Sequence, residues 1–548
     1  MVGSNNWAVS GSKTATGSPI LCNDPHLNTT LPSIWYAIHL NGPDVNVMGV
    51  SLPGAPGVII GFTDSVAWGI TNAQRDLVDW YRITFKDKQC NQYLLDGKWK
   101  DVTKRVEKIN VRDHGTFTDT VSYTKWGPIP FDNNFRPHDG LRDYAFRWIA
   151  HDPSLELLTF YRLNRAKNYN DYMRALDYFS SPAQNFAFAS VSGDIAIRVQ
   201  GKFPVRRKDE GKFLLDGSKS SDGWQAFIPF DQNVMSKNPS RGFVSSANQY
   251  PADDSYPYYI TATSYEAYRN RRINDVLTKL SEITVRDMMS LQNDNYNLKA
   301  SESLPVFLQS IDRSGLLQNS PDTALNTEAV KEAYAILKSW DYVNNKDSEG
   351  AAYYEAWWDH LMPMLWDELN NKDLDLIRPT TYNTIRLIKE YPRLDFFSIA
   401  RDTVQGGNLQ DMLTRSFLAA VASVEQWKKE NKKSKVRWAD YKDTYIQHLA
   451  RIEALSAHVQ HGGSRNSVNA SSRTHGPSWR MVVSLEKSGI KAYGVYPGGQ
   501  SGNPGSVHYM DMLEHWSNGK YFNLSFPHRP DDMKDHVYFS TELNPKNK

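Results

Sequence analysis

Ser4 lies close to the start of the chain, in the run Gly3-Ser4-Asn5-Asn6-Trp7. A serine hydroxyl is a poor nucleophile near neutral pH and needs a base within hydrogen-bond reach. If the Gly3–Ser4 bond is cut, the new α-amine supplies that base, because its reference pKa is about 7.7–8.0. A terminal serine therefore carries nucleophile and base in one residue. The alternative is that Gly3-Ser4 is the remnant of a linker, which is common near a terminus.

The composition is that of an ordinary globular protein and excludes some classes of partner. The chain has 548 residues, with 63 basic against 61 acidic side chains and a net charge of +2. This balance gives no electrostatic case for nucleic acid or an anionic membrane. The longest apolar run, residues 49–62, is interrupted by Pro53 and Pro56 and is too short to cross a bilayer. Cys22 and Cys90 allow at most one disulfide and no cysteine metal framework.

The elements that must position Ser4 change in type along the chain. Runs rich in β-branched and aromatic residues predict strands at residues 18–22, 34–40, 57–61 and 78–85. Residues 185–192 and 195–199, joined by Gly193-Asp194, predict a hairpin. Helical periodicity begins near residue 264 and is clear in residues 328–338 and 412–422. A strand is predicted again around residues 479–485.

Three regions follow from this order of elements. We expect a β-rich part over residues 1–263, a mainly helical region over 264–460, and C-terminal strands and loops over 461–548. Because strand-rich sequence comes before and after the helices, the last region is expected to complete the core of the first. The pattern predicts an α+β architecture with a helical insertion.

Several stretches resemble the β subunit of the penicillin acylase family in order and spacing. They are Gly3–Val9, Asn23–Leu27, Pro53–Gly57, Trp68–Asn72, Gly201–Arg206, Ser246–Gln249, Gly476–Arg480 and Pro497–Pro504. The resemblance covers essentially the whole chain. It implies a four-layer αββα N-terminal nucleophile hydrolase fold, made as a precursor that cleaves itself to expose the β-chain serine. The implied activity is hydrolysis of a linear N-acyl amide bond.

The resemblance also assigns roles at the reacting centre. Ser4 is implied as the nucleophile and its own α-amine as the base. Asn72 falls where the family places a backbone N–H donor for the oxyanion, and Asn248 falls on the side-chain donor. An arginine that orients this donor corresponds to Arg269 or Arg271, of which Arg269 is preferred.

His26 stands where cephalosporin-acylase-like and acyl-homoserine lactone acylase-like members carry a histidine and penicillin G acylases do not. The chain is therefore more similar to the histidine-containing members. A histidine beside the serine hydroxyl is expected to act as a second base or to orient it. The alternative is a loop histidine that caps a turn after Asp24-Pro25, and no carboxylate partner is assigned.

A structural calcium site is implied next to the oxyanion turn. Two carboxylates and two backbone carbonyls supply the hard oxygen ligands that Ca²⁺ prefers, from Asp76, Val78, Asp79 and Pro204. A further carboxylate falls near Asp253 or Asp254. The alternative is that the two aspartates hydrogen-bond a loop. No organic cofactor is expected.

The substrate is less defined than the reaction. Leu27, Ile60 and Ile70 fall on acyl-pocket positions of the family and suit an aliphatic chain at least as well as a phenyl ring. The alternative is that they are core residues. An apolar pocket discriminates weakly, since a methylene is worth only ~1–3 kcal/mol. We expect a small-molecule N-acyl amide, with β-lactam (antibiotic resistance) and acyl-homoserine lactone (quorum quenching) both left open.

The resemblance further implies a partner and a location. Family precursors carry an α segment before the nucleophile, whereas only Met1-Val2-Gly3 precede Ser4 here. We expect a heterodimer with an α subunit from the same precursor, in the bacterial periplasm or secreted, with the signal peptide on that segment. Neither a nucleic acid nor a membrane is an expected partner.

Two other functional classes are compatible with the sequence. The first is a catalytically inactive, acylase-like protein that binds a ligand; retention of Gly3-Ser4, Asn72 and Asn248 argues against it. The second is a carbohydrate-binding or carbohydrate-cleaving protein, suggested by 16 Trp and 29 Tyr residues. Nothing in the sequence points to the particular pair of carboxyl groups that a retaining glycosidase needs.

Overall fold

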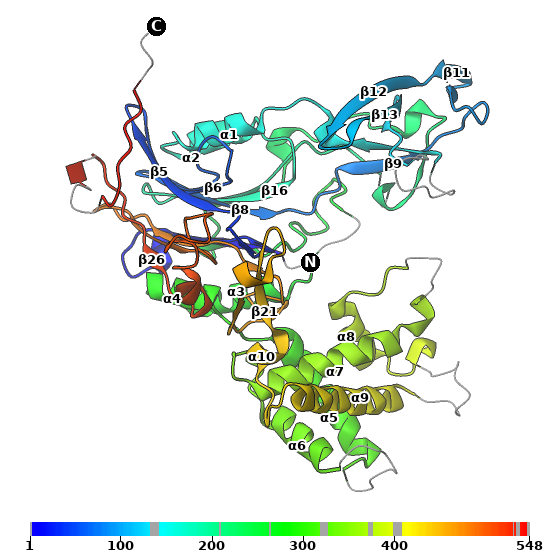
Figure 1. The fold of residues 1–548 in the computed structure, drawn as a ribbon, viewed down its shortest axis with the longest axis vertical. Helices are drawn as coiled ribbons and strands as arrows, with labels where there is room; N and C mark the ends of the chain where they lie inside the picture. The colour runs from blue at the N-terminus through cyan, green and yellow to red at the C-terminus, as the bar shows by residue number, and fades with distance from the viewer. Residues whose placement is uncertain are drawn as a thin grey trace.

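The fold is taken from a computed structural model. It describes residues 3–131, 142–207, 210–261, 265–317, 327–370, 376–397, 408–529, 531–532 and 537–544. Strands outnumber helices in the first 250 residues, as predicted, and helices predominate from residue 268 to residue 442 (Figure 1).

Two antiparallel sheets form the centre of the molecule. The first has six strands in the order β20 (Phe243–Ser246), β1 (Asn5–Val9), β2 (Ile20–Asp24), β24 (Arg480–Ser484), β25 (Lys491–Val495) and β26 (Phe522–Asn523). The second has seven strands in the order β19 (Met235–Lys237), β17 (Ile195–Gln200), β16 (Gln184–Ser190), β8 (Val66–Asn72), β7 (Ile60–Thr63), β6 (Val45–Ser51) and β5 (Tyr36–Gly42). The predicted hairpin is confirmed as β16–β17.

Alternation along β1 shows how the layers stack. Ala8 joins the apolar core between the two sheets, with Trp68 and Phe186 of the second sheet. Trp7 and Val9 point to the opposite face of the first sheet. A strand that is apolar on both faces must be covered on both.

Helices supply the outer layers. The first sheet packs on α3 (Tyr268–Lys279) and α4 (Val285–Gln292) through Ile273, Leu277 and Met288. The second sheet packs on α1 (Glu156–Leu163) and α2 (Tyr169–Leu176). The order is therefore helix, sheet, sheet, helix (Figure 1).

The helical region has a core of its own. It comprises α5 (Leu298–Ser314), α6 (Thr327–Ser339), α7 (Glu349–Leu365), α8 (Thr381–Glu390), α9 (Leu409–Glu430) and α10 (Trp438–Lys442). Trp357 of α7 is fully buried against α9 and donates its indole N–H to Leu413 O at 3.2 Å and to Ser416 Oγ at 3.0 Å. In Figure 1 this region lies apart from the two sheets.

Smaller elements complete the described chain. A long hairpin of β12 (Thr103–Val111) and β13 (Gly115–Thr124) projects beyond β9 (Val78–Arg82), and its outward side chains include exposed Val106, Ile109 and Phe117. The others are β3 (His26–Asn28), β4 (Thr30–Leu31), β10 (Gln92–Leu95), β11 (Lys98–Asp101), β14 (Gly127–Pro128), β15 (Tyr144–Trp148), β18 (Leu215–Asp216), β21 (Thr444–His448), β22 (Ala457–Val459), β23 (His475–Pro477) and α11 (Leu513–Ser517). None of the helices in the described ranges is long and apolar enough to cross a membrane.

Candidate active site

Strand pairing brings residues from two other parts of the sequence to Ser4. Ser4 directly precedes β1, which lies between β2 and β20 in the first sheet. The β1–β2 register pairs Asn5 with Asp24, so that His26 follows beside Ser4. The β1–β20 register pairs Asn6 with Ser246, which brings Asn248 to the other side. Ser4 is 7% exposed, so it sits in a nearly closed site.

Ser4 is held at each of its polar groups. Its backbone N–H donates to Asn248 Oδ1 at 2.5 Å, and its Oγ accepts from the His26 backbone N–H at 3.3 Å. Its carbonyl accepts from the Arg269 guanidinium at 2.8 Å. These contacts fix the positions of the Ser4 nitrogen, carbonyl and hydroxyl.

Arg269 is the arginine that reaches the site. It lies in the first turn of α3 and also donates to Asn248 Oδ1 at 2.9 Å and to Asn5 Oδ1 at 2.7 Å. Burial lowers its pKa to about 10, although Asp24 opposes the shift, so it stays a cation near neutral pH. Arg271, the other candidate, points outward to Glu302, with 2.5 Å between the charged groups.

Asn248 and Asn72 are hydrogen-bonded to each other. The group of Asn72 that takes part is its carbonyl and not the backbone N–H that the family resemblance assigned to the oxyanion. Asn248 has φ 69°, a left-handed conformation that asparagine tolerates better than most residues. Its Nδ2 donates to the carbonyl of Asn72 at 2.7 Å. An amide nitrogen carries two hydrogens, and within the described residues the second has no acceptor. That N–H is available for an oxyanion. The Asn72 side chain is exposed and accepts from the Gln74 N–H at 2.8 Å.

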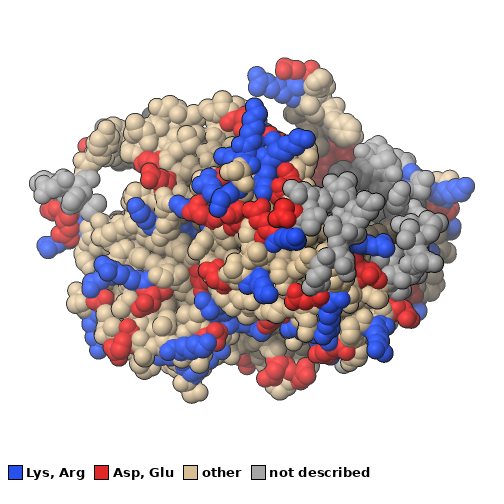
Figure 2. Space-filling model, turned by 90° about the horizontal axis from the view of Figure 1, so that it is seen from below, with Lys and Arg blue, Asp and Glu red and all other residues tan. Residues whose placement is uncertain are grey.

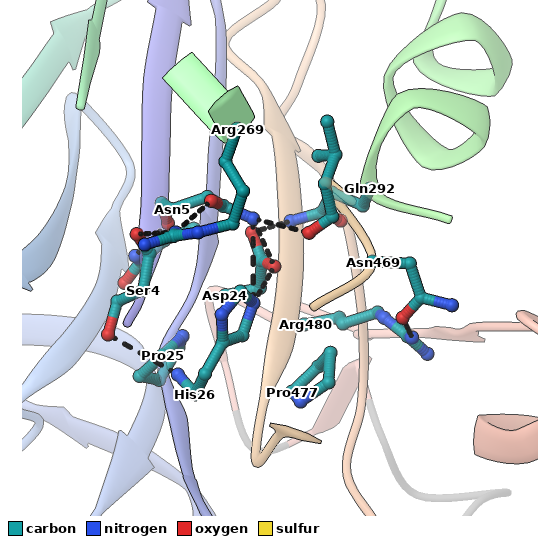
Figure 3. A network of polar contacts seen from close by, with 12 residues as sticks. Ser4, Asn5, Asp24, Pro25, His26, Arg269, Gln292, Asn469, Pro477 and Arg480 are labelled. Carbon is teal, nitrogen blue, oxygen red and sulfur yellow. Dashed lines mark hydrogen bonds and ion pairs between the residues drawn. The ribbon is translucent and has the colours of Figure 1, made fainter. Parts of the chain in front are cut away.

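His26 contacts Ser4 through its main chain and not through its ring (Figure 3). The ring Nε2 lies 2.6 Å from Asp24 Oδ2, and both side chains are wholly buried. Nδ1 has no hydrogen-bond partner among the residues that the structure describes. Burial lowers the His26 pKa, although Asp24 opposes this shift, so the ring is neutral near pH 7. The carboxylate partner that the sequence left unassigned is therefore Asp24.

The three predicted acyl-pocket residues all join the apolar core between the sheets. Ile60 has no exposed surface, whereas Leu27 and Ile70 are half-buried at its edge. Leu27 directly follows His26, and the Ile70 N–H donates to Asn23 Oδ1 at 3.1 Å. Leu27 and Ile70 are thus the two of the three with surface left to offer an acyl chain.

A polar cavity opens on the other side of the site. It measures about 460 Å³, and Gly3 and Arg269 are among the residues that line it. The facing wall comes from the helical region and the loop before β23, with charged residues Lys299, Glu355, Asp359, Lys442, Arg465 and Arg473. A β-carbon on Gly3 would collide with Asn248 Oδ1 and with the Arg269 guanidinium. Only glycine fits between the cavity and Ser4.

The predicted calcium ligands gather around an arginine. Arg206 Nη1 lies 2.9 Å from Asp76 Oδ2 and 2.7 Å from Asp79 Oδ1, and Trp224 donates to Asp79 Oδ2 at 2.5 Å. Burial raises the Asp79 pKa to about 6 even though Arg206 opposes the shift. The donor types suit a hard cation, but three of the four carboxylate oxygens are already bound. As arranged, these residues do not fit a calcium ion.

Two further residues predicted for this site make other contacts. The Asp253 carboxylate accepts from the Ser255 N–H at 3.0 Å and the Ser255 hydroxyl at 2.5 Å. Pro204 forms an isolated bridge with Phe227. In the described part of the chain, no group of three or more His, Cys, Asp and Glu side chains could hold a metal.

The arrangement of layers is that of a solved acylase. A thermostable penicillin G acylase from Alcaligenes faecalis matches with a TM-score of 0.76, covering 99% of this chain and 100% of that one at 18% identity. The likeness establishes the class as an N-terminal nucleophile hydrolase fold, which confirms the predicted α+β architecture. The family model described as penicillin amidase matches residues 1–530. The chain therefore belongs to the penicillin amidase family, as its motifs predicted.

Curated relatives are similar over most or all of this chain. An acyl-homoserine lactone acylase, QuiP, of Pseudomonas aeruginosa is 25% identical over 594 aligned positions, covering 98% of this chain and 68% of the relative. The penicillin acylase 2 proenzyme of Pseudomonas sp. strain SE83 is 25% identical over 65% of this chain and 44% of its own. Penicillin G acylase of Escherichia coli is 24% identical over 64% of this chain and 40% of its own. All three are named acylases, so the prediction of a hydrolase acting on amide bonds is confirmed.

Proposed function

We propose that this chain is the nucleophile-bearing part of an amidohydrolase that cleaves an N-acyl bond through an acyl-Ser4 intermediate. The observation that carries the proposal is the triple anchoring of Ser4: its nitrogen on Asn248, its hydroxyl on the His26 N–H, and its carbonyl on Arg269. Buried main-chain groups need partners in any fold, but here the partners are an amide and a guanidinium side chain rather than a neighbouring strand.

The first reaction is on the chain itself. Ser4 Oγ attacks the Gly3 carbonyl, the peptide C–N bond breaks, and an ester joins Gly3 to Ser4. Water then hydrolyses this ester and releases Gly3 as a carboxylate. The product is a free α-amine on Ser4 next to its hydroxyl. Because the Arg269 cation lies one contact away through Asn248, it disfavours the ammonium form and keeps this amine a usable base.

Turnover then follows the same geometry. The α-amine accepts the Ser4 hydroxyl proton as Oγ bonds to the substrate carbonyl carbon. Negative charge on the carbonyl oxygen is stabilised by the free N–H of Asn248 Nδ2 and the main chain at Asn72. The proton passes to the leaving nitrogen and the amine product departs. Water, deprotonated by the α-amine, splits the acyl–Ser4 ester and releases the carboxylic acid.

The substrate is proposed as a small N-acyl amide. Leu27 and Ile70 offer aliphatic surface beside His26 for the acyl group. Relatives named acyl-homoserine lactone acylase and penicillin acylase support this class. An α subunit from the same precursor is proposed as the partner, since this chain spans about two thirds of the length of the acyl-homoserine lactone acylases. A periplasmic location is proposed with it, and fractionation of the native host tests both.

The intact mass of the purified protein tests the first reaction. We expect a mass lacking Met1, Val2 and Gly3, and hydrolysis of N-acyl amides by that form. Ser4→Ala should keep the three residues and lose turnover completely, because no other hydroxyl occupies this position. A wild-type mass that retains Gly3, or amide hydrolysis by Ser4→Ala, contradicts the proposal.

A further inference from the structure

Asp24 is a buried carboxylate that connects the groups around Ser4 (Figure 3). It ends β2 and has no exposed side-chain surface. It accepts from three side chains: His26 Nε2 at 2.6 Å, Asn5 Nδ2 at 2.9 Å, and Gln292 Nε2 at 3.4 Å. A buried carboxylate needs such donors, because an unpaired one carries a large desolvation cost. Two of the three donors lead back to the nucleophile.

We infer that Asp24 is a positioning residue of the active site, which fixes the tautomer of His26 and the amide orientation of Asn5. The inference rests on the proposed function and adds to it a residue that touches neither Ser4 nor substrate. It acts through two side chains, Asn5 and His26, which share its Oδ2 and lie 3.4 Å apart between Asn5 Nδ2 and His26 Nε2.

The first arm runs through Asn5 to the oxyanion donor. Asn5 Nδ2 donates to Asp24 Oδ2 and to Val468 O, both at 2.9 Å, which uses both of its hydrogens. The amide oxygen must then face the other way, where it accepts from Arg269 at 2.7 Å. If the amide were flipped, its hydrogens would meet the guanidinium, which has only donors. Asp24 thus orients Asn5 for Arg269, and Arg269 in turn holds Asn248 Oδ1.

The second arm runs through the imidazole. A carboxylate oxygen accepts, so the hydrogen of the neutral His26 ring is on Nε2 and Nδ1 is left with its lone pair. The ring is held against Asp24, and the His26 main chain is thereby held with its N–H on Ser4 Oγ at 3.3 Å. Residues 24 and 26 alternate with Pro25, whose fixed φ limits any other path between them.

Asp24→Asn tests the inference, because it keeps the shape and replaces one acceptor with a donor. His26 and Asn5 both donate to Oδ2, and Gln292 donates to Oδ1. If the amide oxygen takes the Oδ2 side, it accepts from His26 and Asn5 more weakly than a carboxylate does and its NH₂ faces the Gln292 donor. If it takes the Oδ1 side, its NH₂ faces His26 and Asn5, and both bonds are lost. We expect kcat on an N-acyl amide to fall about 10²-fold, the size of effect that a 1 Å misplacement produces, with KM within about twofold of wild type. The Ser4 mass test should be run on the same preparation to separate slow processing from slow turnover.

Imidazole ¹⁵N spectra of histidine-labelled protein give a readout independent of activity. His26→Gln identifies the His26 signals by their loss. Wild type should show a protonated Nε2 and an unprotonated Nδ1 at pH 7, and Asp24→Asn should change both signals. A protonated Nδ1 in wild type overturns the inference, whether or not the variant folds.

Ser303→Ala serves as the matched control. Ser303 is equally buried and bonds the Tyr354 hydroxyl at 2.8 Å in the helical core, away from Ser4. It should lower the melting temperature and leave kcat and the His26 signals unchanged. Wild-type kcat in Asp24→Asn overturns the inference while the proposed function stands. If the wild-type protein has no amidase activity, the proposed function is contradicted instead. The ¹⁵N spectra then still test whether Asp24 fixes the tautomer of His26.

Discussion

Asn248 combines three tasks in one side chain. Its amide oxygen accepts hydrogen bonds from the Ser4 N–H and the Arg269 guanidinium. Its amide nitrogen donates one hydrogen to Asn72 O, and the second hydrogen has no acceptor among the described residues. Because the oxygen is fully used, the amide cannot flip, and the spare N–H points to a defined place. This is the kind of preorganised donor that lowers the barrier of amide hydrolysis.

Loss of the Asn248 amide should therefore reduce kcat by about 10²–10³-fold, as loss of one oxyanion donor does in other hydrolases. Both Asn248→Ala and Asn248→Gly remove the amide, but only glycine tolerates φ 69° without strain. We expect equal kcat in the two variants and a lower melting temperature for alanine. Steady-state kinetics after confirmed release of Gly3 make the comparison. An unchanged kcat in Asn248→Gly would remove Asn248 from the chemistry.

Sequence motifs singled out the residues that contact Ser4, yet they passed over Asp24 and Asn5. Both lie inside quoted motifs, next to a candidate. Their contact arises from the β1–β2 register, which pairs Asn5 with Asp24 across a turn of ten residues. A pairing register depends on both strands and on the turn between them, so a single segment does not reveal it. The signal that was present is the spacing of Asp24 and His26, which are two residues apart on either side of Pro25, since side chains at that spacing in an extended segment point to the same side.

At the scale of elements, the alternation of short apolar runs predicted the sheets well. The strand predicted at residues 479–485 is β24, and helices α6 and α9 contain the two predicted helical stretches. Helices α1 and α2 were missed inside the strand-rich part, because each has only eight residues and so little more than two turns in which a helical period could be seen. The pairing of β24 with β2, over 450 residues away, required the folded chain.

The loop that follows β8 should depend on Arg206 for its stability. Arg206→Met leaves buried Asp79 and half-buried Asp76 without the guanidinium that pairs with both, and we expect the free energy of unfolding to fall by about 3–5 kcal/mol. Excess calcium should restore part of this loss, while wild type unfolds alike in calcium and in EDTA. Urea denaturation under the four conditions measures this.

Arg271→Met is the matched control for that loop, because Arg271 is half exposed and its pair with Glu302 should contribute less than about 1 kcal/mol. If the wild-type protein loses stability in EDTA, the arrangement around Arg206 is contradicted, and Asp76 and Asp79 are calcium ligands after all.

At the scale of the whole molecule, charged side chains of both signs are mixed over the surface, and the buried apolar side chains form separate clusters. Basic and acidic side chains are interspersed on the face shown in Figure 2, in line with a net charge of +2. The αββα core and the helical region bury separate clusters, which meet near the start of α3. The candidate active site and its polar cavity lie between them, so residues of both shape it.

Two buried neutral histidines should make this molecule sensitive to mild acid. Burial lowers the pKa of His26, and it lowers that of His461 well below its usual value, with Lys442 and Arg480 adding to the shift. In the unfolded chain each histidine gains a proton as the pH falls below about 6.5. Stability is then complete above that pH and falls below it, by up to about 1.4 kcal/mol per pH unit for each histidine.

His461→Gln should remove the contribution of His461 to this pH dependence of stability and leave that of His26. We expect a shallower fall in melting temperature between pH 7.5 and 5.5, measured by calorimetry for both proteins. Asp79 acts in the opposite sense below its pKa of about 6, but it is present in both and cancels. Parallel curves for the two proteins would contradict this, because they would mean that His461 binds its proton as readily in the folded state as in the unfolded chain.

The close packing around Gly3 has a consequence for the gene as well as for the protein. Every amino acid that a single-base change can put in place of glycine brings a β-carbon, and a β-carbon here meets Asn248 and Arg269. No missense change at this codon is conservative. Selection on the proposed self-cleavage would therefore act on position 3 as strictly as on the serine beside it.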